Sequence, residues 1–302
     1  MSAASAASAT FPERRAPLGA RITRVIARTP IHLSLLFIGA VWLVPTIGLL
    51  VTSFRERDDI HSTGWWTAFV DRRFSLDTYI HVLTSRGTTD SLAQNFLNSL
   101  IITIPSTILP VLIASLAAYA FAWISFRGRD WLFLTLVALL IVPIQMTFVP
   151  VLQLFNVVHL TGNYLGIWIA HTAYGLPFAI YLLHSSFAGL PRSLIEAARM
   201  DGSGELRTFW RIVLPLSVPG IASLAIFQFL WVWNDLLVAL IYLQSPNLQP
   251  MTVGVVNLLT TYGTEWDLLS AAAFLTMGIP LVVFFSLQRY FVSGLLAGAV
   301  KS

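Results

Sequence analysis

The chain contains few charged residues and no cysteine. Only 11% of its 302 residues are charged, whereas a soluble globular chain carries about 25%. So little charge cannot cover a water-exposed surface, so most of the chain is expected to lie in lipid. The absence of cysteine excludes disulfides, thiolate zinc sites and cysteine nucleophiles.

Lysine is almost absent too, which limits the ways in which this chain could bind ATP. Lys301 is the only lysine, and no G-x-x-x-x-G-K-[ST] segment occurs, so this chain cannot form a phosphate-binding P-loop. The motifs H-E-x-x-H and G-x-S-x-G are missing as well, which argues against a membrane-embedded enzyme. No basic segment interleaved with aromatics indicates nucleic-acid binding, and His171 and His184 show no metal-ligand spacing.

What the sequence has instead is long apolar segments. About 20 mostly apolar residues in a helix cross a hydrocarbon core about 30 Å thick. The sequence therefore predicts an all-α membrane protein with six transmembrane helices. The six segments are approximately 31–51, 96–123, 131–155, 164–187, 217–243 and 268–287.

The basic residues are distributed unevenly between the two sides of these spans. Thirteen of the 18 Lys and Arg residues lie in the N-terminal tail, the loops 124–130 and 188–216, and the C-terminal tail. The opposite loops hold five, all within 52–95, together with six acids. By the positive-inside rule, both termini and the 188–216 loop face the cytoplasm.

Prolines recur inside the predicted spans, where each removes a helix hydrogen bond and favours a kink. They could be ordinary bends that neighbouring helices compensate. The alternative is that the bends at Pro143, Pro150 and Pro177 shape a pathway that opens alternately to each side.

The segment EAARMDGSGELRTFWRIVLP (196–215) is unusually polar and interrupted by glycine. Pro191 is tolerated in the first turn of a helix, and Asp201–Gly202 would end that helix. A second short helix would follow and end at Leu214–Pro215. Its apolar face would be formed by residues at helical spacing, namely Leu206, Phe209, Trp210 and Val213. The pattern predicts two short helices that meet at a glycine.

Three interpretations of this segment remain open on pattern alone. Ser193 and Glu196 fit a capping box, in which Glu196 would only satisfy backbone donors. The amphipathic stretch could lie on lipid headgroups. The third interpretation is a docking device for a cytoplasmic partner.

The spacing of this loop favours the docking interpretation. The order E196-A-A, Gly202 and Ile212-x-Leu214-Pro215 resembles the signature loop of permease subunits of bacterial ABC importers. The flanking residues are similar to those of carbohydrate importers, in particular the smaller permease of maltose-type and α-glucoside-type systems. The resemblance covers roughly residues 30–302. It includes NFLNSLIIT (95–103), WVWNDLLVAL (231–240) and QRYFVSGLLAGAVKS (288–302).

The resemblance implies a type I importer permease fold whose coupling helix sits in a cleft of a cytoplasmic ATPase. Glu196 would meet basic groups there, Ala197 and Ala198 would allow close approach, and Gly202 would make the bend. The implied coupling residues are Glu196, Ala197, Ala198, Asp201, Gly202, Ile212, Leu214 and Pro215. The implied ATPase-contacting tail residues are Gly294, Gly298 and Lys301. Gly294-x-x-x-Gly298 could instead be a helix-packing motif.

The family also implies a domain organisation and a set of partners. Residues 1–30 would be a cytoplasmic tail, 31–95 the first helix and outer loop, 96–287 the core permease domain, and 288–302 a cytoplasmic C-terminal tail. The partners would be a second homologous permease, two ATPase subunits and an extracytoplasmic substrate-binding protein, in the bacterial inner membrane. This chain would need no cofactor itself, since ATP and Mg would bind the ATPase.

The substrate path is the least determined part of the sequence. Aromatic and polar side chains suited to sugar binding are Asn98, Tyr119, Gln145, Tyr174, Gln228, Trp231, Asn234 and Asp235. Aromatic residues are also routine at membrane interfaces, and Asn234–Asp235 could serve as a cap or an inter-helix contact. In the family, the sugar is held mostly by the sister permease.

Two further questions stay open at this stage. The expected cargo is an α-glucoside or maltose-like oligosaccharide, with glycerol-phosphate-type cargo as the alternative. An ion-coupled carrier would need several ionisable groups within the spans, and Asp235 is the one acid there. The aromatic residues of loop 52–95 could contact a substrate-binding protein or form an interfacial cap.

Overall fold

The computed structural model describes residues 18–84, 92–262 and 266–299, and the side chains of 29–84, 92–258 and 266–288. Helices account for all the regular structure in these ranges. Four helices are long and apolar enough to cross a membrane, and the number rises to six if two bent helix pairs each count as one span. The prediction of an all-α membrane protein is confirmed.

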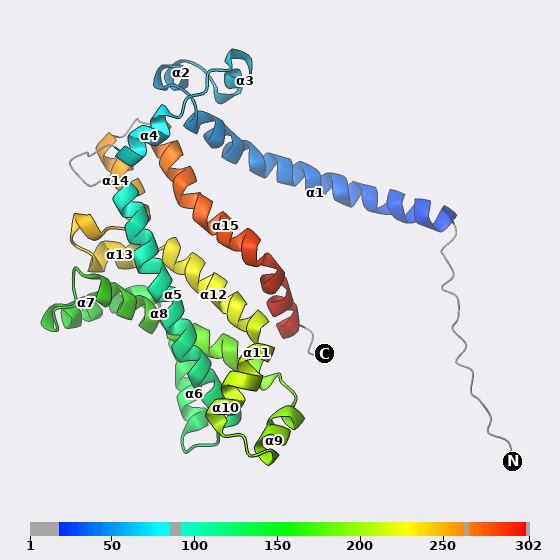
Figure 1. The fold of residues 1–302 in the computed structure, drawn as a ribbon. Coiled ribbons are helices and arrows are strands. Elements are labelled where there is room, and N and C mark those ends of the chain that lie inside the picture. The colour runs from blue at the N-terminus through cyan, green and yellow to red at the C-terminus, as the bar shows by residue number, and fades with distance from the viewer. Residues whose placement is uncertain (1–17, 85–91, 263–265, 300–302) are drawn as a thin grey trace.

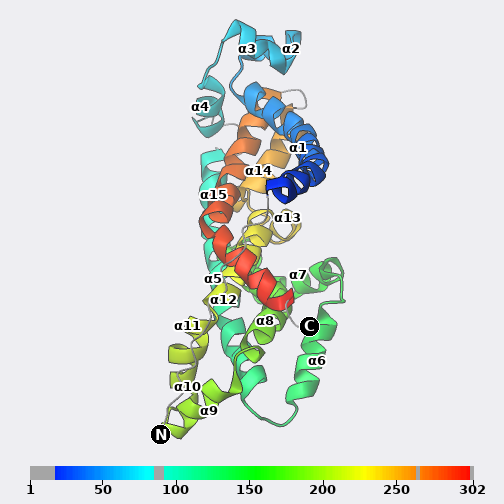
Figure 2. The ribbon, with the colours of Figure 1, turned by 90° about the vertical axis from the view of Figure 1, so that its right-hand side faces the viewer.

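A central group of helices runs the length of the molecule (Figures 1 and 2). Its most extensive contact joins α5 (Leu92–Trp123) to α8 (Tyr164–Ala188). Against these pack α12 (Val218–Trp233) and α15 (Trp266–Ala299). At one end, here called the α4 end, lie α2 (Arg57–Ser62), η1 (Trp65–Thr67), α3 (Ala68–Asp71), α4 (Asp77–Thr84), η4 (Pro246–Leu248) and α14 (Met251–Tyr262). The opposite end, the α9 end, carries α9 (Arg192–Met200) and α10 (Glu205–Thr208).

The first helix, α1 (Leu18–Ser53), leaves this group of helices (Figure 1). Only 11% of its apolar 18-residue window is buried. The part of the helix that is apolar enough to cross a membrane begins at Thr29, close to the predicted start at residue 31, but the helix itself begins earlier, at Leu18. The reason is that residues 18–29 contain no proline and are mostly apolar residues and arginines, several of them good helix formers. Residues 1–17 lie outside the described part.

The third predicted span is not one helix. It divides into α6 (Arg129–Leu139), η2 (Ile144–Thr147) and α7 (Phe148–Val157), and the two halves are bent by 97°. Pro143 stands at the break with an extended ψ of 121°. Proline lacks an N–H and disfavours the helical conformation in the residue before it, so α6 ends before Pro143. The expectation of a continuous helix over 131–155 is therefore corrected.

The fifth predicted span is broken as well. Helix α12 ends at Trp233, and the short helix α13 (Leu237–Tyr242) follows after Asn234–Leu236. At its other end, α12 makes an angle of 77° with the helical segment Glu205–Leu216 that precedes it. Pro219 occupies the first turn of α12, where a missing N–H costs little. The chain thus turns sharply into the bundle near Ser217.

Most of the other prolines do not interrupt their helices. Pro45, Pro105, Pro110, Pro177 and Pro280 all lie inside continuous helices. Pro150 sits in the first turn of α7. Of the three bends expected to shape a pathway, only the one at Pro143 coincides with a break.

Close packing of α8 on α12 generates a first prediction. A Cβ atom added at Gly175 would lie 2.7 Å from both terminal atoms of the buried Gln228 amide, whose nitrogen donates to the Ser106 carbonyl at 3.2 Å. Gly175→Ala should therefore destabilise the protein by about 1–3 kcal/mol through overpacking and loss of that bond.

The matched control is Gly278→Ala in α15, where a Cβ would meet nothing within 4 Å. This change should leave the thermal unfolding temperature of the detergent-solubilised protein unchanged or raise it, because alanine favours a helix. Equal unfolding temperatures for the two variants would contradict the close approach at Gly175.

Candidate functional site: a helical elbow at one end of the bundle

Residues 192–216, here called the elbow, form two short helical arms at the α9 end of the bundle. The first arm, α9, begins after Pro191 and ends at Asp201. Gly202 follows with φ +75°, a left-handed conformation that glycine adopts without a Cβ clash. The second arm starts at Glu205. The two helices and the glycine joint agree with the sequence prediction.

The second arm differs from the predicted regular helix. It consists of α10, a π-helical turn η3 (Phe209–Val213) and α11 (Leu214–Leu216), so it ends one residue beyond Pro215. Phe209 and Val213 are buried, but Leu206 and Trp210 are 69% and 55% exposed. The predicted four-residue apolar face is therefore wrong, since only Phe209 and Val213 are buried, and the π turn that contains Trp210 departs from the 3.6-residue period on which the prediction rests.

The inner face of the elbow belongs to the core of the bundle. Ile195, Phe209 and Val213 are at most 2% exposed and form one apolar cluster with α5 and α8. The bundle residues in that cluster include Ala114, Ala118, Ile180, Leu183 and Phe187. Burial of so many apolar groups anchors both arms, since each fully buried large side chain contributes about 1.5–3 kcal/mol.

The outer face of α9 presents Glu196 to solvent. The capping-box interpretation is wrong, because Pro191 is the N-cap and Ser193 lies inside the helix. Glu196 is exposed and has no hydrogen bond or ion pair to any residue that the structure describes. Its neighbours Leu194 and Met200 are 42% and 88% exposed. The outer face therefore combines an unpaired carboxylate with apolar side chains.

The remaining implied coupling residues divide between the two faces. Ala197, Asp201, Gly202 and Pro215 are exposed. Ala198 is only 6% exposed and faces the bundle, so Ala197 is the more accessible of the two alanines. Ile212 and Leu214 are half-buried against the apolar cluster. Gly294 and Gly298 lie in the backbone of α15, and Lys301 lies outside the described residues.

A polar network that the sequence did not predict ties the elbow to α5. The Tyr119 hydroxyl donates to Glu205 Oε2 at 2.6 Å, and the Arg199 guanidinium lies 3.0 Å from Glu205 Oε1. Arg199 also donates to the Trp123 carbonyl at 2.9 Å. Tyr119, which we expected in a substrate path, thus bonds to the elbow. The feature of the sequence that could have revealed this network is the pair of opposite charges, Arg199 and Glu205, on either side of the Asp201–Gly202 turn.

Two of the expected path residues serve helix packing. Asn98 is fully buried, donates to the Asn247 and Gln249 carbonyls, and accepts from the Tyr164 hydroxyl at 2.8 Å. It thereby ties α5 and α8 to the segment before α14. The buried Gln228 amide joins α12 to α5 through the Ser106 carbonyl. Both amides are therefore engaged in contacts between helices.

Two of the other expected path residues, Tyr174 and Trp231, pack against the same apolar cluster. The Tyr174 hydroxyl lies 2.6 Å from that of Tyr242 and links α8 to α13. Trp231 is half-buried, with its ring edge-to-face against His171 at 5.5 Å. Gln145 and Asn234 are exposed. The structure therefore does not bring the eight expected residues together in one site.

Asp235 occupies the break between α12 and α13. Its carboxylate accepts from the backbone N–H groups of Val238 and Ala239, at 3.4 and 3.0 Å, as a helix cap does. Its own carbonyl accepts from Thr252 at 2.6 Å. The imidazole of buried His171 lies 3.8 Å from the carboxylate. These contacts agree with the interpretation of Asp235 as a helix cap.

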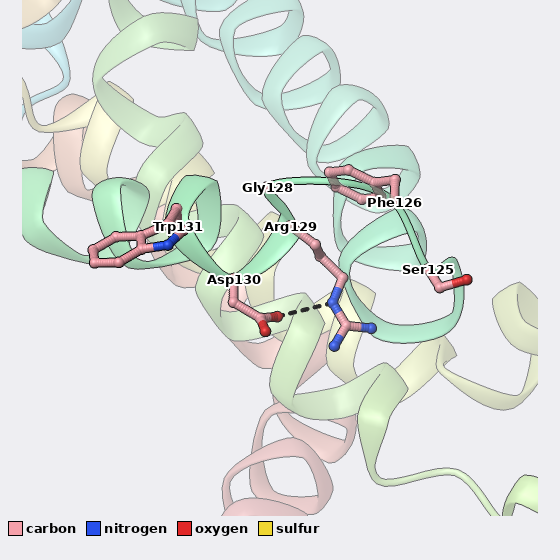
Figure 3. Close-up of a pocket in the computed structure, with 6 residues that line it drawn as sticks. All are labelled: Ser125, Phe126, Gly128, Arg129, Asp130 and Trp131. Carbon is pink, nitrogen blue, oxygen red and sulfur yellow. Dashed lines mark hydrogen bonds and ion pairs between the residues drawn. The ribbon is translucent and has the colours of Figure 1, made fainter.

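A surface hollow of about 280 Å³ lies elsewhere, in the turn that leads from α5 into α6 (Figure 3). Its lining residues are Ser125, Phe126, Gly128, Arg129, Asp130 and Trp131. Arg129 and Asp130 pair with each other at 3.0 Å. None of the expected path residues lines it. Among the described residues, no cluster of three His, Asp or Glu side chains could hold a metal ion.

The cap at Asp235 generates a second prediction. Asp235→Asn keeps one acceptor oxygen, which can accept from the Ala239 N–H, and loses only the 3.4 Å contact with Val238, so the unfolding temperature should stay close to that of the original protein. Asp235→Ala removes the cap and should cost about 0.5–2 kcal/mol in thermal unfolding of the purified protein. A fall in unfolding temperature with Asp235→Asn as large as that with Asp235→Ala would contradict a capping role.

Comparison with known proteins agrees with this architecture. Residues 110–296 match the family model described as the binding-protein-dependent transport system inner membrane component. The osmoprotective compounds uptake permease protein GgtD of Synechocystis sp. is 50% identical over 287 residues, which cover 93% of this chain and 95% of the relative. The alpha-glucoside transport system permease protein AglG of Rhizobium meliloti is 38% identical, with 96% of this chain and 99% of the relative covered.

A solved structure shares the fold. A chain of a bacterial ABC transporter involved in the import of the acidic polysaccharide alginate superposes with a TM-score of 0.61 at 17% identity, over 93% of this chain and 100% of that chain. The family match spans more than half of the sequence, including the elbow. The chain belongs to the inner membrane components of binding-protein-dependent ABC importers, as a non-catalytic permease subunit.

Proposed function

We propose that this permease moves an α-glucoside or maltose-like oligosaccharide into the cytoplasm by alternating access, driven by separate ATPase subunits that grip the elbow. The observation that carries the proposal is the two-sided construction of α9. Ile195 on its inner face is buried in the bundle, while Glu196 on its outer face is exposed and unpaired among the described residues.

Docking to a protein fits α9 better than lying on lipid. An interfacial helix needs a free apolar face to insert among lipid headgroups and acyl chains. The apolar face of α9 already lies inside the bundle through Ile195 and Ala198. What remains outside is Glu196 with Leu194 and Met200, a surface suited to a cleft with basic and apolar walls. A force applied there would reach the bundle through the buried inner face.

The sequence also supports an energy source on a separate subunit. The sequence has no P-loop motif, so ATP and Mg would be bound by the partner ATPase. The excess of arginine on the elbow side favours a cytoplasmic location for the elbow and both termini. The largely exposed surface of α1 would be covered by lipid and by a second permease subunit. An extracytoplasmic binding protein would deliver cargo at the α4 end.

The cargo proposal rests on the relatives. AglG, which is 38% identical, is named as an alpha-glucoside permease. GgtD, which is 50% identical, is named for osmoprotective compounds, so an osmoprotectant is the second candidate. A thermal-shift screen of the cognate binding protein tests the choice. Stabilisation by α-glucosides is expected, whereas stabilisation only by osmoprotectants without a glucoside unit, or only by a glycerol phosphodiester, would contradict it.

The glycine joint gives a third prediction. Gly202→Val places a β-branched residue at φ +75°, a strain of about 1–3 kcal/mol, and should change the angle between the two arms. Uptake should fall strongly while the subunit still inserts in the membrane. Gly204→Val is the matched control, because Gly204 has φ −69° and open space around a Cβ. Equal uptake by the two variants would contradict a role for the joint.

The exposed carboxylate gives a fourth prediction. Glu196→Lys would place like charges together in a basic cleft, so co-purification of the ATPase should fall by more than about tenfold. Glu56→Lys makes the same charge change on an exposed residue of the outer loop and should leave co-purification unchanged. Normal ATPase recovery with Glu196→Lys would exclude docking through this face.

A further inference from the structure

A chain of polar contacts fixes the elbow to one particular helix of the bundle. Glu205, the first residue of α10, accepts from the Tyr119 hydroxyl with one carboxylate oxygen, at 2.6 Å. Its other oxygen accepts from Arg199 Nε at 3.1 Å. Arg199 in the last turn of α9 also donates to the carbonyl of Trp123, the last residue of α5. Arg199 thus joins the first arm to α5 directly, Glu205 joins the second arm to α5 through Tyr119, and the pair of Arg199 with Glu205 links the two arms.

These contacts differ in kind from the apolar contacts around them. The Tyr119 and Phe209 rings pack edge-to-face at 5.3 Å, within the apolar cluster that buries the elbow. Apolar packing is non-directional and permits small rotations and slips. A charge-assisted hydrogen bond has a defined length and angle, and so fixes the position of one element relative to another. Tyr119 is 4% exposed, whereas the side chains of Arg199 and Glu205 are 43% and 44% exposed, so the bond from the buried Tyr119 hydroxyl fixes the elbow more firmly than the exposed ion pair does.

We propose that Glu205 is a positioning residue that passes the movement of the elbow to α5. The inference rests on the proposed function, since it needs an ATPase that moves α9. The bridge from Arg199 through Glu205 to Tyr119 makes both arms and the end of α5 move as one body. Without the bridge, the elbow can still dock, but its movement is partly lost in slippage against the apolar cluster.

The test is the amount of substrate taken up per ATP hydrolysed, measured with the complete transporter in proteoliposomes. Tyr119→Phe keeps the ring and its packing on Phe209 but removes the hydroxyl, and Glu205→Gln keeps the shape but removes the charge. Each should lower the ratio by about tenfold, the effect of losing one hydrogen bond to a charged group. The double variant should be no worse than the more affected single variant, because both changes break the same bridge.

Two control variants show whether a change in the ratio of substrate taken up to ATP hydrolysed is specific to the bridge. Tyr181→Phe removes a hydroxyl from a tyrosine on α8 that is 47% exposed and has no hydrogen bond among the described residues. Glu56→Gln makes the same change as Glu205→Gln on an exposed residue that precedes α2, outside the elbow. Both variants should couple normally.

The outcomes separate this inference from the function on which it rests. If the original protein recovers no ATPase, the proposed function fails. If the original protein couples normally and Tyr119→Phe and Glu205→Gln match it, the positioning role is overturned. A fall in ATPase recovery with an unchanged ratio would also overturn it, because that result indicates a purely structural contact.

Discussion

Ile195 and Phe209 lie buried against the ends of α5 and α8, and this contact decides what the α9 end of the molecule can do. Because the inner face of the elbow is part of the bundle core, movement of the elbow displaces the helices behind it, and the bridge from Arg199 through Glu205 to Tyr119 limits slippage at this contact. Because the outer face keeps Glu196 free of described partners, it remains available for another subunit. A single short segment thus joins a surface for docking to the core of the permease.

The rest of the structure is consistent with a permease that changes its shape but does not itself hydrolyse ATP. The breaks at Pro143 and at Asn234–Leu236 divide two spans into shorter helices, which gives the bundle places to bend without breaking long helices. The side chains at these breaks are satisfied locally, as Asp235 shows by capping α13. Polar residues such as Asn98 and Gln228 tie helices together inside the bundle. The family match and the proposed cargo fit a protein that forms the substrate path, with ATP hydrolysis carried out by a partner subunit.

The sequence predicted the membrane class, the six apolar segments and the two arms of the elbow, because hydropathy, Pro191 and Gly202 act locally. It did not predict the break after Trp233, since that break depends on where the Asp235 carboxylate points. It missed the contact between Tyr119 and Glu205 because 86 residues separate them in the chain. It did not show that the Asn98 and Gln228 amides bond between helices, because residue type alone does not distinguish a buried contact between helices from a binding group.

The most direct test of this account uses the absence of cysteine. The substitution Ala197→Cys, at an exposed position beside Glu196, introduces the only thiol in the chain. A short thiol-reactive cross-linker is then applied to the assembled transporter. The account predicts a covalent product with the ATPase subunit, and labelling of the introduced thiol only from the cytoplasmic side. Labelling by a membrane-impermeant reagent added outside the cell, or no product despite full labelling, would contradict it.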